Sequence, residues 1–341
     1  MTIHEIPGRT VKSRELYGDF WFNSEPVPIS ALHGQVILLH FWDYTCVSCL
    51  RTLPYVKEWN RRYRDQSLIV VGVHSPKHPF AKNPEEVQKA IERLGITYPI
   101  VLDNQSMIAS SYDNRSCPAM VLIDKHGYVR LRSVGEGGYQ VIEHTIQTLL
   151  WDAGVREDFP APMEPLRDED KSGAVSYRAT PELLTGYLQG SIGNVEGYSP
   201  ESVIDYDDPG FYLEGKFYAD GPWMNGRNCL RMTEEGNSGN IIVRYHAREA
   251  HAVVKPEGKT GFEVTVTQDD GFLTRENKGD DIHLDKSGRS YLVVSESGLY
   301  ALVKNKEFGE HTLRLTTQSS GFGLYALSFV SCAIRETVSN N

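Results

Sequence analysis

The chain has 341 residues, of which 40% are hydrophobic and 23% charged, and its formal net charge at pH 7 is −10. This length predicts two or three domains, and the acidic balance without a basic run argues against a nucleic-acid partner. No stretch approaches the ~18 uninterrupted apolar residues that a membrane span needs, and residues 1–20 lack the apolar core of a signal peptide. We therefore expect a protein without a membrane partner, cytoplasmic as the sequence is written, or extracytoplasmic if a leader has been removed.

The first elements lead into a buried strand. Residues 1–20 form a lead-in, and Trp21–Phe22 is predicted as a short edge strand or a clasp. Residues 36–39 form a short apolar run that is β-branched at its start, which is typical of a strand covered on both faces. A polar turn at 43–45 follows, and apolar residues at helical spacing run from 50 to about 66.

Between the turn and the helix stands the sequence Cys46-Val47-Ser48-Cys49. If Thr45 caps the helix, Cys46 lies at the helix N-terminus and Cys49 lies one turn later on the same face. The partial positive charge and the unpaired N–H groups of a helix N-terminus both stabilise a thiolate. Cysteines in such sites have pKa values of roughly 3.5 to 7.5, compared with about 8.5 for free cysteine. The pattern therefore predicts a redox site in which Cys46 attacks a disulfide and Cys49 resolves the mixed disulfide.

A zinc site is the alternative for a Cys-x-x-Cys pair. Structural zinc needs a second pair of ligands at a similar spacing. The three other cysteines, Cys117, Cys229 and Cys332, are scattered singly, and no cysteine accompanies the paired histidines His74 and His78. We therefore expect no metal and no cofactor other than the redox-active dithiol itself.

Strands and helices alternate through the rest of the first 158 residues. Asn83 as N-cap and Pro84 at the first position start a helix that Gly95 ends. Residues 125–127 form the turn of a β-hairpin. Further strands are expected at 67–73, 98–102, 116–124 and 128–134, and further helices at 105–112 and 139–151.

The order β-α-β-α-β-α-β-β-α resembles the thioredoxin fold, specifically its TlpA-like redoxin branch, over roughly residues 20–155. The motifs that carry the resemblance are HFWDYTCVSCLRTLP, GVHSPKHPFAKNPEEVQKAI, CPAMVLID and GEGGY. The resemblance implies an α/β domain over residues 1–158, with a central mixed sheet flanked by helices. The sequence is also similar to DipZ-type proteins, which carry a second, β-rich domain behind a thioredoxin-like ectodomain.

In thioredoxin-like proteins, a cis-proline before the last hairpin packs against the dithiol, and Pro118 occupies that place. It would present the backbone of Cys117 to an extended substrate segment. The alternative is an ordinary proline at the start of a strand. The Cys117 sulfur would lie close to Cys46, where it could form an alternative disulfide, modulate the thiolate, or fill a gap as a small apolar side chain.

The resemblance also points to side chains that support the dithiol. His40 stands where thioredoxin has a buried acid that relays protons to the resolving thiol. An imidazole could do the same near neutral pH, or it could be a core histidine bonded to backbone. Trp42 belongs to the same motif, and Glu136 is expected near the site. Lys77 stands where related sequences often carry a glutamate, so the role of that acid is in doubt here.

The second half has a different pattern. Residues 159–181 are rich in Pro, Asp and Glu and are expected to form a linker or a strap over the first domain. Residues 182–341 predict an all-β jelly roll or β-sandwich, similar to a carbohydrate-binding module in the DipZ-type relatives. Its short strands are expected at 211–219, 241–245, 262–267, 290–295, 299–303, 312–316 and 324–330.

A sugar site would need an aromatic platform, for which Trp223, Tyr212, Tyr218 and Tyr198 are candidates. Such residues are more often core or inter-strand packing. Paired acids could supply oxygen ligands for calcium, although we favour solvated turn acids. These pairs are Asp207 with Asp208, Asp269 with Asp270, and Asp280 with Asp281.

The leading functional hypothesis is a thiol–disulfide oxidoreductase that acts on protein or small-molecule disulfides and is served by an unidentified electron donor. A glycan- or partner-binding protein with a secondary redox role is the main alternative. A peroxiredoxin is disfavoured because its peroxidatic cysteine follows a threonine and a proline, whereas Asp43 and Leu39 stand at those places before Cys46.

Overall fold

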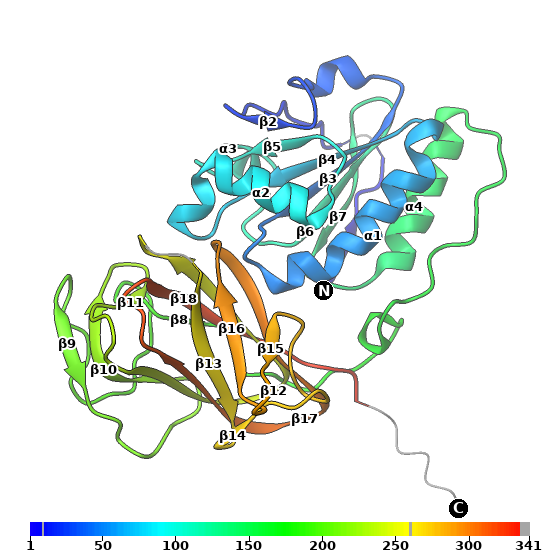
Figure 1. Ribbon diagram of the computed structural model, residues 1–341. Coiled ribbons are helices and arrows are strands. Elements are labelled where there is room, and N and C mark those ends of the chain that lie inside the picture. Colours follow the sequence, from blue (N-terminus) through cyan, green and yellow to red (C-terminus); the bar gives the residue numbers. More distant parts are fainter. Residues whose placement is uncertain (9, 259–260, 335–341) are drawn as a thin grey trace, which may run out of the picture. The chain divides into compact units, whose positions relative to one another are not determined.

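The computed structural model describes residues 1–8, 10–258 and 261–334 (Figure 1). The chain divides into two compact units, Met1–Ala174 and Val175–Asn341. The segment 159–181 therefore divides between the units. The domain limits expected from the sequence, 1–158 and 182–341, stay a prediction.

The first unit contains a seven-stranded mixed sheet in the order β1-β7-β6-β3-β4-β5-β2. Its strands are β1 (Thr2–Glu5), β2 (Trp21–Phe22), β3 (Val36–Trp42), β4 (Leu68–His74), β5 (Ile100–Leu102), β6 (Ala119–Ile123) and β7 (Val129–Val134). Its α-helices are α1 (Val47–Tyr63), α2 (Pro84–Leu94), α3 (Met107–Ser111) and α4 (Tyr139–Ala153). Short 3₁₀ turns lie at Ile29–Leu32, Arg64–Gln66, Pro79–Lys82 and Asp168–Asp170.

The helices cover both faces of this sheet. Strands β3, β4 and β5 are parallel neighbours, and right-handed crossovers through α1 and α2 place both helices on one face. The α4 helix lies beside α1 on this face (Figure 1). The ring of Tyr139 on α4 stacks on the ring of Tyr55 on α1, with ring centroids 3.7 Å apart. On the other face, alternate β3 residues such as Phe41 pack with Ile108 of α3. The predicted thioredoxin fold is confirmed.

Local signals in the sequence set the ends of α2. The Asn83 side chain accepts a hydrogen bond from the Glu85 N–H, as an N-cap residue does. Gly95 ends the helix in the left-handed conformation at φ +59°, which glycine adopts without steric cost. Both predictions for this helix are confirmed.

The segment after α4 binds to the helices of its own unit. Tyr55 Oη donates to Asp170 Oδ2 at 2.8 Å and accepts the Leu166 N–H at 2.7 Å. The Met163 N–H donates to the Glu143 carboxylate at 2.7 Å. Of the two sequence alternatives for this segment, these bonds favour a strap over a free linker.

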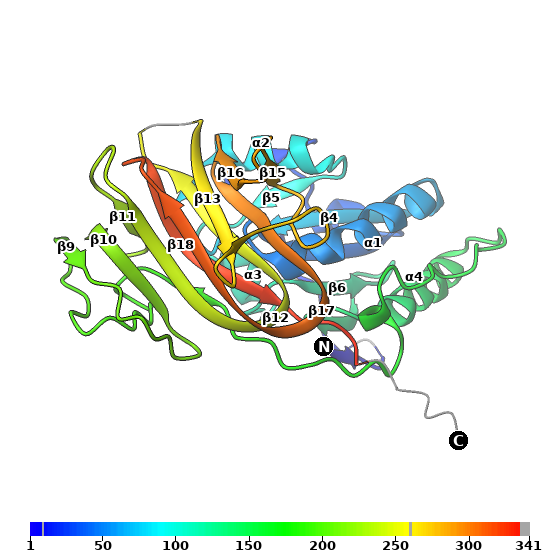
Figure 2. The ribbon, with the colours of Figure 1, turned by 60° about the horizontal axis from the view of Figure 1, so that its bottom comes forward.

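The second unit is an eleven-stranded sheet in which every strand pair described is antiparallel (Figure 2). This confirms the predicted all-β class. The first strands are β8 (Leu183–Leu184), β9 (Val203–Tyr206), β10 (Phe217–Asn225), β11 (Leu230–Met232) and β12 (Gly239–Pro256). The later strands are β13 (Phe262–Gln268), β14 (Gly271–Phe272), β15 (Ile282–Leu284), β16 (Ser290–Val294), β17 (Gly298–Thr317) and β18 (Phe322–Val330).

Two strand predictions for this unit are wrong. The strands expected at 299–303 and 312–316 are one strand, β17, because it pairs with β12 on both sides of a bulge opposite Arg248. The strand expected at 211–219 begins only at Phe217. Gly215, with φ at +77°, interrupts extended backbone before that point.

Candidate active site

The dithiol lies where β3 ends and α1 begins. Cys46 is the N-cap residue of α1, and its sulfur accepts the Cys49 N–H at 3.2 Å. Cys49 Sγ lies 2.6 Å from Cys46 Sγ. The expectation that Thr45 caps this helix is wrong, because both its N–H and its hydroxyl donate to Asp43 Oδ1, at 2.8 and 2.9 Å. A backbone N–H of the α1 N-terminus is therefore directed at the Cys46 sulfur.

The two cysteines have different environments. Cys46 is partly exposed and Cys49 is buried. Burial raises the pKa of the Cys49 thiol well above its usual value, and the neighbouring thiols of Cys117 and Cys46 add to this shift. Cys49 therefore stays protonated while Cys46 faces solvent beside a backbone N–H. This asymmetry suits an attacking thiol followed by a resolving thiol.

The segment before β6 brings Cys117 and Pro118 to the dithiol. The Cys117–Pro118 peptide bond is cis, which confirms that prediction. The Cys46 thiol lies 3.8 Å from the Cys117 carbonyl oxygen. The Cys117 thiol is also a neighbour of the Cys49 thiol and contributes to its raised pKa. Three thiols therefore meet at this edge of the sheet.

Asp43 is a residue of the site that sequence reasoning did not single out. Its carboxylate is buried and accepts the Lys77 N–H at 2.7 Å, in addition to the two bonds from Thr45. His74 Nε2 lies 3.7 Å from the same carboxylate. A lone acid between a buried strand and a Cys-x-x-Cys pair is the signal that could have identified it. Asp43 fixes the turn that presents Cys46.

Lys77 lies within electrostatic reach of the thiols. Removal from water lowers the pKa of its ammonium group, while Cys46 and Asp43, followed by Cys49 and Cys117, act in the opposite sense. A cation therefore stands near the dithiol in place of the acid that related sequences often carry.

His40 and Trp42 are fully buried on β3. Burial lowers the pKa of His40 to about 3, so its ring stays neutral near neutral pH. Neither ring nitrogen of His40 has a hydrogen-bond partner among the described residues. These facts argue against a proton relay near neutral pH and favour a core histidine, although without the expected backbone bond. Trp42 packs edge-on against His74, with ring centroids 5.2 Å apart.

Glu136 is bonded to Arg51, which lies two residues after Cys49 on α1. Arg51 Nε donates to Glu136 at 2.7 Å, and its Nη2 donates to Glu169 at 2.6 Å. Glu169 belongs to the segment that follows α4. Arg51 therefore anchors the first turns of α1 to the two segments that carry Glu136 and Glu169.

Two residues of the aromatic platform predicted in the second unit lie in its interior. Trp223 and Tyr218 are 0% and 1% exposed, and Trp223 lies in the hydrophobic core of this unit. The Tyr212 hydroxyl donates to the Asp208 carboxylate at 2.8 Å. The Tyr198 hydroxyl donates to the Thr185 carbonyl oxygen at 2.8 Å. Burial therefore removes Trp223 and Tyr218 from the predicted glycan site, whereas Tyr212 and Tyr198 are partly buried, and glycan binding stays a prediction.

One acid of each predicted pair is held by a protein partner. Asp208 also accepts from Arg314 at 3.2 Å. Asp269 accepts the Thr312 N–H at 2.8 Å, and Asp281 accepts the Ala301 N–H at 2.6 Å. Within the described part of the chain, no group of three or more His, Cys, Asp or Glu side chains is arranged to hold a metal ion.

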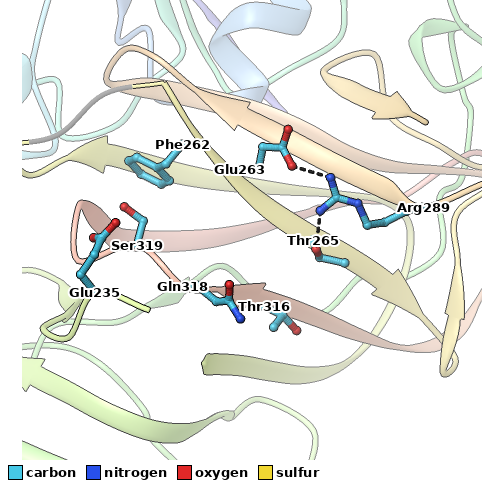
Figure 3. Close-up of a pocket in the computed structure, with 8 residues that line it drawn as sticks. All are labelled: Glu235, Phe262, Glu263, Thr265, Arg289, Thr316, Gln318 and Ser319. Atoms are coloured by element: carbon cyan, nitrogen blue, oxygen red, sulfur yellow. Dashed lines mark hydrogen bonds and ion pairs between the residues drawn. The ribbon is translucent and has the colours of Figure 1, made fainter. Parts of the chain in front are cut away.

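A groove of the second unit is lined by none of the predicted aromatic residues (Figure 3). Its volume is about 390 Å³. Within it, Arg289 pairs with Glu263 and donates to Thr265 Oγ1. The lining residues are Glu235, Phe262, Glu263, Thr265, Arg289, Thr316, Gln318 and Ser319. Arg289 of this groove is thus engaged with two other lining residues.

Among the residues that the structure describes, no helix has both the length and the apolar character that crossing a membrane requires.

Comparison with known proteins agrees with this geometry. A model of the Redoxin family matches residues 22–146, and a model described as thioredoxin-like C-terminal domain matches residues 180–329. The thiol-disulfide oxidoreductase YkuV of Bacillus subtilis is 30% identical over 137 residues, which cover 40% of this chain and 92% of YkuV. The thiol-disulfide oxidoreductase ResA of Halalkalibacterium halodurans is 27% identical over 130 residues, or 38% of this chain and 70% of ResA. The chain therefore belongs to the thioredoxin-like family of thiol–disulfide oxidoreductases, in its redoxin branch.

The two-part architecture of this chain points to a further relative. Protein DipZ of Mycobacterium tuberculosis is 35% identical over 255 residues, which cover 73% of this chain. The same match covers only 35% of DipZ, so the chain spans about a third of the length of that relative. The redoxin segment followed by the thioredoxin-like C-terminal domain makes the architecture DipZ-like.

Proposed function

We propose that the chain exchanges thiols and disulfides through Cys46 and Cys49, with Cys46 as nucleophile and Cys49 as resolving thiol. The observation that carries this proposal is the position of Cys46 as the N-cap of α1, with its sulfur 3.2 Å from the Cys49 N–H and 2.6 Å from Cys49 Sγ. An N–H directed at sulfur stabilises negative charge there.

The first step is attack on the substrate. The Cys46 thiolate attacks one sulfur of a substrate disulfide, and a bond forms between Cys46 Sγ and that sulfur. The other substrate sulfur leaves with the electron pair of the broken bond and takes a proton from water. The partly exposed position of Cys46 gives a substrate access to it.

The second step is resolution. Cys49 loses its proton and attacks Cys46 Sγ, which releases the second substrate thiol and leaves a Cys46–Cys49 disulfide. Burial keeps the pKa of Cys49 high, so Cys49 does not compete with Cys46 for the first attack. An external dithiol donor then returns the site to its reduced form. The substrate class is a protein or small-molecule disulfide.

A trapping experiment tests these roles. Cys49→Ser should accumulate a mixed disulfide between Cys46 and a reducible protein such as insulin, because the resolving thiol is gone. Cys46→Ser should form no such adduct, and Cys332→Ser, outside the first unit, should turn over like wild type. If the Cys46→Ser variant formed an adduct on Cys49 in the same yield as the Cys49→Ser variant forms on Cys46, the assignment of roles would be contradicted.

A further inference from the structure

A third thiol takes part in the contacts of the dithiol. Cys49 Sγ lies 2.6 Å from Cys46 Sγ, and the Cys117 thiol also interacts with the Cys49 thiol. The carbonyl of Cys117 lies 3.8 Å from Cys46 Sγ, so the backbone of Cys117 is fixed against the same site. Cys49 therefore stands between two possible disulfide partners. The two remaining cysteines, Cys229 and Cys332, belong to the second unit.

We propose that Cys117 is a third redox thiol of this site, which moves the disulfide of the oxidised chain from Cys46–Cys49 to Cys49–Cys117. This inference rests on the proposed function, since it begins from the disulfide that resolution leaves behind. Thiol–disulfide exchange needs a thiolate within reach of a disulfide sulfur, and Cys117 is the third thiol beside the Cys46–Cys49 pair.

The exchange step balances without an outside oxidant. Cys117 loses its proton to solvent, and its thiolate attacks Cys49 Sγ. A Cys49–Cys117 bond forms as the Cys46–Cys49 bond breaks, and the electron pair of the broken bond remains on Cys46 Sγ. One disulfide is present before and after the step, so the chain is neither oxidised nor reduced. The released Cys46 thiolate accepts the Cys49 N–H hydrogen bond.

The exchange changes what the oxidised chain can do. Cys46 is free to attack a substrate disulfide while Cys49 is tied to Cys117 and is unable to resolve the mixed disulfide. Release then requires a thiol of the substrate itself, which attacks its sulfur on Cys46 and forms a new substrate disulfide. That sequence rearranges disulfides without net reduction. The substrate class is therefore a protein that carries both a disulfide and a free thiol.

Disulfide mapping of the full-length chain tests the inference directly. Cys229→Ser and Cys332→Ser together leave the three site cysteines as the only thiols. The oxidised protein is alkylated with iodoacetamide under native conditions, digested with trypsin and mapped by mass spectrometry. Cleavage at Arg14, Arg51, Arg115 and Lys125 places Cys117 on a peptide separate from the one that carries Cys46 and Cys49.

We expect peptide 116–125 cross-linked through Cys117 to peptide 15–51, with the alkyl group on Cys46. The matched variant Cys117→Ser should lose this alkylation of Cys46 in its oxidised form. Cys46→Ser should oxidise to a single Cys49–Cys117 disulfide. Alkylated Cys117 beside an intact Cys46–Cys49 disulfide would overturn the inference and leave the proposed function standing. Absence of a disulfide among all three cysteines would overturn both.

Discussion

The two units differ in how far their reactive and polar side chains are exposed and paired. In the first, Cys46, Cys49 and Cys117 meet at one edge of a sheet, and Cys46 and Cys117 remain partly exposed. In the second, rings such as Trp223 are buried, and acids such as Asp208 are held by neighbouring side chains. Fixed spacing of cysteines at a helix N-terminus thus identifies a reactive site, whereas residue type along alternating strands does not identify a binding surface. Four substitutions test this difference between the units.

The largest expected effect is the loss of exchange activity in Cys46→Ser. Removing the nucleophile should lower the rate of insulin disulfide reduction on the order of 10³-fold or more. Cys229→Ser, in the second unit, is the matched control and should retain the wild-type rate. Comparable rates for the two variants would remove the chemical distinction between the units.

Trp223→Ala tests whether the second unit uses its central aromatic residue for packing. The side chain is 0% exposed, so its removal leaves a cavity and should lower the free energy of unfolding by about 3–5 kcal/mol. Phe211, which is 63% exposed, provides the control, and Phe211→Ala should change it by less than about 0.5 kcal/mol. Urea denaturation measures both values. A stable Trp223→Ala protein would mean that the ring does not hold the core together.

Asp43→Asn compares a buried acid of the site with an exposed acid of the second unit. The amide has one acceptor oxygen in place of the carboxylate pair that serves Thr45 and the Lys77 N–H. Leaving a buried donor unpaired should lower the free energy of unfolding by about 2 kcal/mol. The control, Asp280→Asn, changes an exposed side chain and should be close to neutral. Equal denaturant midpoints would show that Asp43 does not fix the turn.

The smallest expected effect is a pH dependence that arises from His40. Burial lowers its pKa from 6.5 to about 3, so the folded chain holds the ring neutral while the unfolded chain protonates it below about pH 6.5. Stability from this group is therefore present above pH 6.5 and is lost as the pH falls, by about 1.4 kcal/mol per pH unit. Between pH 6.5 and 5, wild type should lose about 2 kcal/mol more than His40→Leu. Parallel pH profiles of the two proteins would contradict the buried, neutral ring.

Local signals predicted much of the first unit. The apolar run of β3, the caps of α2 at Asn83 and Gly95, and the hairpin of β6 and β7 all lie where the sequence places them. Each depends on residues close together in the chain. The role of Asp43 was not predictable in that way, because one of its partners is the backbone of Lys77, 34 residues away.

The second unit was predictable in class and less so in detail. Alternation reveals that strands exist, but it does not say where a strand continues through a bulge, as β17 does past Asn305. It also leaves open which of the two alternating faces lies inward. Trp223 and Tyr218 were therefore plausible surface residues in the sequence, and only the structure, in which they are 0% and 1% exposed, shows them to be interior.

The measurement that tests the central claim most directly is equilibration of the full chain against glutathione, followed by mass spectrometry of the site peptides. We predict a single exchangeable two-electron couple that involves Cys49 and, in the Cys117→Ser variant, links only Cys46 with Cys49. The midpoint of that titration also gives the reduction potential of the site. If Cys46 and Cys49 remain reduced under conditions that oxidise glutathione fully, the site is not a redox centre and the account fails.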